Sequence, residues 1–185
     1  MINIICYTGG CCGDLLTALI DSQNVDCAQS AITIIPERSK LKKPHLFTND
    51  IEKDQYIIEA SSKWKSIPSH DLAYHINRRH NFIGITVKDK SMAIWAAERF
   101  KQLHSPHVWK EMQAACGVST VKDYAQMLLD FSNLIAQYTD KIVSLESICN
   151  GTAIQELKKY IDNDMLSDNT HFYKNWLTLQ TKTSI

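Results

Sequence analysis

Short runs of apolar residues alternate along the chain with longer segments whose apolar residues recur at helical spacing. The clearest runs are residues 1–7 (MINIICY) and 82–87 (FIGITV), which are rich in β-branched residues. Runs of this kind, without polar alternation, are typical of strands that helices cover on both faces. Three weaker runs, at residues 30–36, 66–70 and 141–145, predict further short strands.

The segments between these runs predict helices, because their apolar residues recur every three or four positions. The pattern is strongest in residues 121–138, which Ser119 or Thr120 can cap. One further predicted helix begins near Leu15. The others span residues 50–64, 71–79, 90–103, 107–116, 154–161 and 172–180. Strands that alternate with helices predict a three-layer α/β/α fold with a mainly parallel sheet.

A glycine-rich turn lies between the first predicted strand and the first predicted helix. This glycine turn consists of Thr8, Gly9, Gly10, Cys11, Cys12, Gly13 and Asp14. In a strand–turn–helix arrangement, backbone N–H groups and the helix dipole converge on one point and favour a bound anion. The pattern therefore predicts a phosphate- or sulfate-binding loop. The alternative is that the three glycines only allow a tight turn to pack against the sheet.

Other polar segments also follow predicted strands directly. They are the basic loop 37–44, the pair Ser69-His70 and the pair Lys88-Asp89. Ligands of parallel α/β proteins bind beyond the carboxyl ends of the strands, so we expect these segments near the glycine turn. For the basic loop, the competing interpretation is an ordinary solvated run of charges.

This layout resembles the sulfotransferase-like branch of the P-loop nucleotide-binding fold, in the short form encoded by tailed phages. The resemblance is one of pattern and covers most of the chain. It is carried by the glycine turn after the first strand and by Ser69-His70 after another strand. Lys88-Asp89, between residues 82–87 and a long helix, completes it.

The resemblance implies a donor, a reaction and a role for each matching residue. Residues Thr8 to Gly13 of the glycine turn would hold the phosphosulfate of PAPS (3′-phosphoadenosine 5′-phosphosulfate) or of a related adenine nucleotide, with Asp14 beside it. Lys88 would contact the 3′-phosphate of that donor. His70 would take a proton from an acceptor hydroxyl or amine while the sulfuryl group is transferred. The acceptor itself is not specified by the sequence.

Several features of the family are replaced in this chain. The glycine turn contains no lysine, and Pro68 stands where the family has one. Ala96 stands near the position of a phosphate-binding serine. Loss of cations weakens the electrostatic stabilisation of a transition state. These replacements favour the alternative hypothesis of a non-catalytic binding or assembly module with the same fold.

Charge balance, cysteine and histidine spacing and chain length indicate which partners and ligands to expect. Twenty Lys and Arg residues balance twenty Asp and Glu residues, which argues against nucleic acid or an anionic membrane as a partner. The six cysteines form no CxxC pair and the seven histidines stand at no zinc-site spacing, so we expect no metal site. A length of 185 residues predicts one domain, residues 1–185, and leaves a homo-oligomer open.

The cysteines also bear on location and chemistry. The N-terminal segment lacks the pattern of a signal peptide, which predicts a cytoplasmic protein with free thiols, in the host cytoplasm if the chain is viral. Cys11 and Cys12 stand at a predicted helix N-terminus, where a thiol pKa is lowered. A nucleophilic cysteine, with His70 or His75 as its partner, is therefore an alternative to the small apolar role that most buried thiols have.

Overall fold

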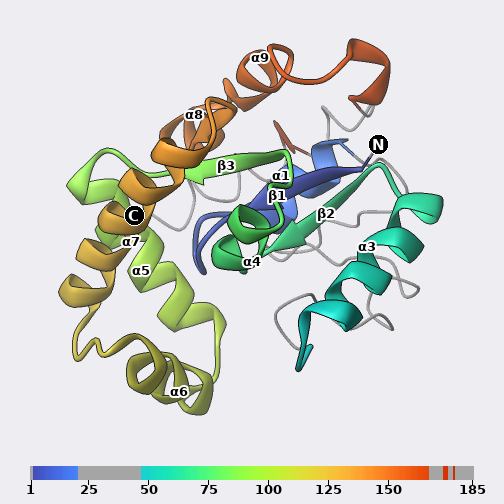
Figure 1. Ribbon diagram of the computed structural model, residues 1–185. Coiled ribbons are helices and arrows are strands. Elements are labelled where there is room, and N and C mark those ends of the chain that lie inside the picture. Colours follow the sequence, from blue (N-terminus) through green and yellow to red (C-terminus); the bar gives the residue numbers. More distant parts are fainter. Residues whose placement is uncertain (1, 21–46, 167–172, 175–176, 178–185) are drawn as a thin grey trace.

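The computed structural model describes residues 2–20, 47–166, 173, 174 and 177 (Figure 1). The described strands form one all-parallel sheet in the order β2-β1-β3-β4. Their bounds are Asn3–Cys6 for β1, Ser66–Ser69 for β2, Phe82–Thr86 for β3 and Ile142–Ser144 for β4. The corresponding four predicted strands are confirmed. The predicted strand 30–36 and the basic loop 37–44 lie outside the described residues.

Helices follow every described strand. They are α1 (Gly13–Ile20), α3 (Asp50–Lys63), α4 (Leu72–Asn77), α5 (Lys90–Leu103), α6 (Pro106–Cys116), α7 (Val121–Tyr138), α8 (Leu145–Asn150) and α9 (Ala153–Leu157), followed by a 3-10 turn, Asn163–Met165. Helix α8 was not predicted, because its first residue was assigned to the preceding strand. Of the predicted helix 172–180, the three described residues are helical. In the described part of the chain, no helix is long and apolar enough to cross a membrane.

Polar side chains fix where the long helices begin and end. The Thr120 hydroxyl accepts the Asp123 N–H at 3.2 Å and the Asp123 carboxylate accepts the Thr120 N–H at 2.8 Å, which is a capping box. Thr120 is therefore the cap of α7 that the sequence predicted. Helix α6 begins at Pro106 and ends at Gly117, whose left-handed conformation (φ 65°) suits glycine.

The core has two parts because successive side chains of a strand point to opposite faces of the sheet. Ile5 and Ile85 belong to the larger apolar cluster, which also contains side chains of α1, α5 and α8. Ile4 and Phe82 belong to the smaller cluster, with side chains of α3, α4 and the second half of α7, such as Ile135. Helices thus cover both faces, and the predicted three-layer α/β/α fold is confirmed.

The strand order creates a topological switch point between β1 and β3. Among the described strands, the chain passes from β1 to its neighbour β2 and then crosses back to pair β3 with the other edge of β1. The segments that leave β1 and β3 therefore diverge at the carboxyl edge of the sheet. This is the place where ligands of open parallel sheets bind, and the glycine turn lies there.

Candidate functional site at the carboxyl edge of the sheet

The glycine turn changes the direction of the chain within a few residues. The Cys11 N–H donates to the Thr8 carbonyl at 3.1 Å. Gly10 and Cys12 both have positive φ angles, of 91° and 59°. Helix α1 starts directly afterwards, and the Thr17 hydroxyl donates to a carbonyl in its first turn at 2.8 Å. The strand–turn–helix arrangement predicted from the sequence is confirmed.

Two glycines of the turn pack directly against α5. A Cβ atom at Gly9 would lie 2.5 Å from the Phe100 ring, and the Gly9 carbonyl accepts the Tyr124 hydroxyl of α7 at 3.2 Å. A Cβ atom at Gly10 would lie 2.3 Å from the Ala96 carbonyl oxygen. These glycines are therefore needed for packing, as the alternative interpretation of the turn holds, whatever the turn binds.

Gly13 is close-packed in the same way, against the end of β1. A Cβ atom there would lie 2.1 Å from the Tyr7 ring. Burial, and then the negative charge of the neighbouring Asp14, raise the pKa of the Tyr7 phenol well above its ordinary value. The phenol therefore stays neutral and carries its proton at any physiological pH.

The backbone of the glycine turn supplies hydrogen-bond donors. Between described residues, the turn makes one backbone hydrogen bond through its own N–H groups, the one donated by Cys11. The N–H groups of Gly9, Gly10, Cys12 and Gly13 donate to no described backbone carbonyl. They precede or open an eight-residue helix, whose dipole favours an anion at this end.

His70 lies next to the start of the turn, where its ring contacts Tyr7. Its Nδ1 atom is 2.8 Å from the Tyr7 carbonyl oxygen, and its ring centroid is 4.2 Å from that of Tyr7. Because a carbonyl oxygen only accepts hydrogen bonds, Nδ1 carries a proton, and when the ring is neutral its lone pair lies on Nε2. The structure thus brings together the ends of β1 and β2, as the sequence predicted.

Lys88 follows β3 at the same edge, but its backbone makes the contacts. The N–H groups of Lys88 and Asp89 donate to one carboxylate oxygen of Glu146, at 2.9 and 2.8 Å. The Lys88 side chain is exposed, and no hydrogen bond or ion pair between described residues joins it to the glycine turn. Glu146 thus ties the β3–α5 connection to the end of β4.

Arg99 is the cation that the structure places next to the glycine turn. Its guanidinium lies beside the Cys12 thiol and counteracts part of the rise in the pKa of that thiol. Arg99 also lies over the Trp95 ring, 5.5 Å from its centroid. In the sequence Arg99 resembles any exposed helix charge. Arg99 stands one helical turn after Ala96, whose carbonyl contacts the turn, and this packing of α5 places its side chain here.

Burial keeps the thiols of this region protonated. It raises the pKa of Cys12 to about 11 and of Cys149 to about 12, and it raises the pKa of Cys11 further. At a helix N-terminus the dipole alone would lower these values, but here burial is the larger effect. The arrangement therefore favours small buried thiols over a nucleophilic cysteine.

Three buried side-chain oxygens at this edge have no hydrogen-bond partner among the described residues. They are Asp14 Oδ1 after β1, Thr86 Oγ1 at the end of β3 and Glu146 Oε2 after β4. Buried polar atoms are normally paired with protein, water or ligand. The carboxyl edge therefore contains enclosed oxygen atoms as well as the N–H donors of the turn.

No protein family, curated protein or solved structure matches this chain. In the part of the chain that the structure describes, no group of three or more His, Cys, Asp or Glu side chains is arranged to hold a metal ion.

A buried polar cluster lies beside the end of β2. The Ser69 hydroxyl accepts the Asp71 N–H at 3.2 Å and lies 2.7 Å from His75 Nε2. The other ring nitrogen of His75 is 3.1 Å from His80 Nδ1. His75 is fully buried, and burial followed by the proximity of His80 lowers its pKa to about 4.

We expect this cluster to make folding sensitive to mild acid. In the unfolded chain His75 has an ordinary pKa of about 6.5, so between pH 6.5 and pH 4 the unfolded state binds more protons than the folded state. The low pKa of His75 therefore adds its full contribution to the free energy of unfolding above pH 6.5. This contribution falls by about 2 kcal/mol between pH 7.5 and pH 5. Urea unfolding at these two pH values measures the loss.

The matched variants are His75→Gln, which removes the titrating ring, and His107→Gln, which changes an exposed histidine on α6. From pH 7.5 to pH 5, the free energy of unfolding should fall less in His75→Gln than in the unchanged protein. In His107→Gln it should fall by the same amount as in the unchanged protein. An unchanged loss in that variant would contradict the assignment.

Proposed function

We propose that this protein binds a phosphorylated adenine nucleotide of the PAPS type over the glycine turn and transfers its sulfuryl group to an acceptor hydroxyl or amine. The observation that carries the proposal is the 2.8 Å contact between His70 Nδ1 and the Tyr7 carbonyl. It sets the tautomer that a neutral His70 ring adopts, next to the residue that precedes the turn.

Each part of the site has a task in this reaction. The N–H groups of the turn would bind the phosphosulfate, and Arg99 would supply the positive charge that the turn lacks. His70 Nε2 would accept the proton of the acceptor as a new sulfur–acceptor bond forms and the bond from sulfur to the phosphate oxygen breaks. Adenosine 3′,5′-bisphosphate then leaves. The exposed Lys88, across the switch point, would contact its 3′-phosphate.

Calorimetric titration with adenosine 3′,5′-bisphosphate tests the binding step. We expect micromolar affinity in the unchanged protein and a loss of at least about tenfold in Arg99→Ala, because a charge-assisted hydrogen bond contributes about 1.5–3 kcal/mol. Lys110→Ala, which removes an exposed cation from α6, is the control and should bind normally. No heat at millimolar nucleotide, with folded protein, would reject the proposal.

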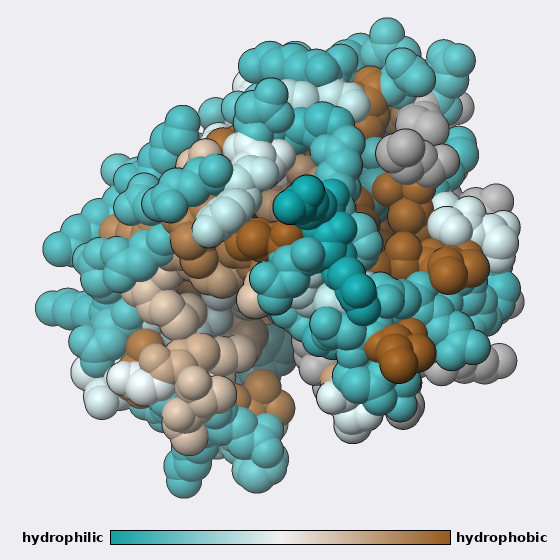
Figure 2. Space-filling view, viewed as in Figure 1, coloured by the Kyte–Doolittle hydropathy of each residue, from teal (hydrophilic) through white to brown (hydrophobic). Residues whose placement is uncertain are grey.

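The second candidate is a non-catalytic assembly module. The specific observation in its favour is a pair of isoleucines on α3, Ile51 and Ile58, which are 75% and 70% exposed and two helical turns apart. Figure 2 shows apolar atoms over α3 that stand among hydrophilic residues. The carboxylates of Asp14 and Glu146 beside the turn, where a P-loop enzyme has cations, point the same way. A stable homo-oligomer by light scattering, combined with no nucleotide binding, would favour this candidate.

A further inference from the structure

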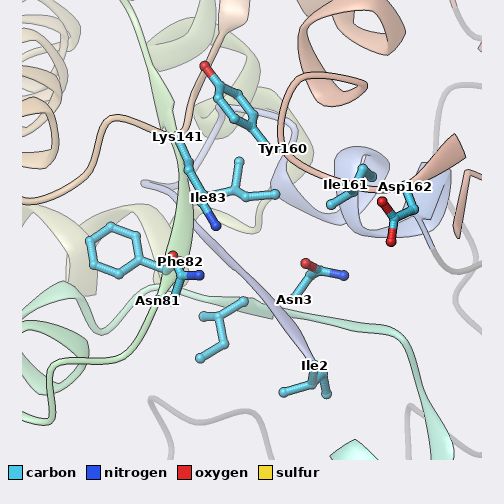
Figure 3. Close-up of a pocket in the computed structure, with 10 residues that line it drawn as sticks. Ile2, Asn3, Asn81, Phe82, Ile83, Lys141, Tyr160, Ile161 and Asp162 are labelled. Carbon is cyan, nitrogen blue, oxygen red and sulfur yellow. The ribbon is translucent and has the colours of Figure 1, made fainter.

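A cavity lies at the amino edge of the sheet, opposite the glycine turn (Figure 3). It has a volume of about 260 Å³ and is bounded by the starts of β1 and β3, by the residue before β4 and by the chain that follows α9. The glycine turn lies at the other end of the same strands. This cavity is therefore separate from the carboxyl-edge site and independent of the proposed function.

Opposite charges stand on two sides of this cavity. In Figure 3 the Lys141 side chain extends into the cavity with its ammonium group toward the centre, and the Asp162 carboxylate lies across from it. None of the ion pairs between described residues includes Lys141 or Asp162. Lys141 is half-buried, so its charge is only partly hydrated and favours an anionic group on a ligand.

Amide groups lie between the two charges. Asn3 and Asn81 both line the cavity, and Figure 3 shows Asn3 in the space between Lys141 and Asp162. The Asn3 amide nitrogen donates to the Lys65 carbonyl at 3.1 Å, which holds the Asn3 side chain in place. A ligand with its own donors and acceptors therefore meets a polar strip flanked by a cation and an anion.

The remaining wall is apolar. It is formed by Ile83, Ile161 and the ring of Tyr160, which pack in the larger apolar cluster, whereas Ile2 lines the cavity from the side of the smaller cluster. The Tyr160 hydroxyl donates to the Ile142 carbonyl at 3.1 Å and, as Figure 3 shows, points away from the cavity. The phenol thus contributes only its hydrocarbon surface to this wall, which suits an aliphatic group.

We propose that the amino-edge cavity binds a zwitterionic α-amino acid with an aliphatic side chain. Lys141 would contact the carboxylate of the ligand, Asp162 its ammonium group, and the isoleucine wall its side chain. The volume is near the lower limit of small-molecule sites, about 300 Å³, which suits an amino acid better than a whole nucleotide. The separated charges distinguish this ligand from a simple carboxylic acid, which would leave Asp162 without a partner.

Calorimetric or NMR titration with L-leucine tests the inference. We expect a dissociation constant of about 1 mM or lower. We also expect binding at least tenfold weaker for 4-methylpentanoate, which lacks the ammonium group, and for 3-methylbutylamine, which lacks the carboxylate. Binding of 4-methylpentanoate equal to that of leucine would overturn the zwitterion assignment. No binding of leucine at 20 times the expected constant would overturn the site itself.

Matched variants locate the site. Lys141→Met keeps the aliphatic stem and Asp162→Asn keeps the shape of an exposed residue, and each should weaken leucine binding at least tenfold. Lys158→Met changes an exposed cation at the end of α9 and should bind leucine normally. Equal weakening in all three variants, or in none, would overturn the assignment. Unchanged thermal unfolding would show that each variant is folded.

Discussion

Gly10→Ala is expected to lower the free energy of unfolding by about 4 kcal/mol. The new Cβ atom would lie 2.3 Å from the Ala96 carbonyl oxygen, and this oxygen belongs to the backbone of α5, which cannot rotate away as a side chain can. The φ angle of 91° at Gly10 adds a conformational penalty for any residue with a Cβ atom. Urea unfolding of the variant measures both effects together.

Gly117→Ala separates the two effects. Gly117 also has a positive φ, 65°, but a Cβ atom there would have no neighbour within 4 Å. We expect this variant to lose only about 1 kcal/mol, the cost of the left-handed conformation. Equal losses in the two variants would show that contact with α5 is not what requires glycine in the turn. Because of this contact, substitutions at Gly10 report on folding rather than on ligand binding.

His70→Gln is expected to lower the rate constant of sulfuryl transfer by about 10²- to 10⁴-fold. A glutamine amide can still donate to the Tyr7 carbonyl, so the local structure is retained, but it cannot accept a proton at neutral pH. Turnover with PAPS and a phenol or amine acceptor measures the change. His107→Gln, on the exposed surface of α6, is the control.

The affinity for adenosine 3′,5′-bisphosphate should stay the same in His70→Gln, because the imidazole acts on the acceptor and not on the nucleotide. A normal turnover rate in this variant would remove His70 from the reaction. A loss of nucleotide affinity would indicate that the ring binds the donor instead.

The fold was largely predictable because its strands are short apolar runs with clear ends. Residues 82–87 lack polar alternation, and the corresponding strand is covered on both faces, as expected. Residue type limited the cap of α7 to Ser119 or Thr120, and the structure shows Thr120. The order of the strands was not predictable, because the pairing of β1 with both β2 and β3 depends on contacts between residues far apart in the chain.

The candidate site was predictable only in part. The glycine turn and His70 lie directly at strand ends, where topology alone brings them together. Arg99 and Glu146 depend on how α5 and α8 are oriented, and no local pattern encodes that orientation. In the sequence, two explanations were open for the glycines of the turn: binding of an anion and tight packing. The contacts with α5 show that packing is one of them, and anion binding stays a prediction.

The most direct test of the central claim is an NMR titration that follows the backbone N–H resonances of the glycine turn as adenosine 3′,5′-bisphosphate is added. We expect the resonances of Gly9, Gly10, Cys12 and Gly13 to shift most and to saturate with one dissociation constant, while that of Asn81, just before β3 at the opposite edge of the sheet, does not change. Saturating shifts confined to other regions, or no shifts at millimolar nucleotide, would contradict nucleotide binding by the glycine turn.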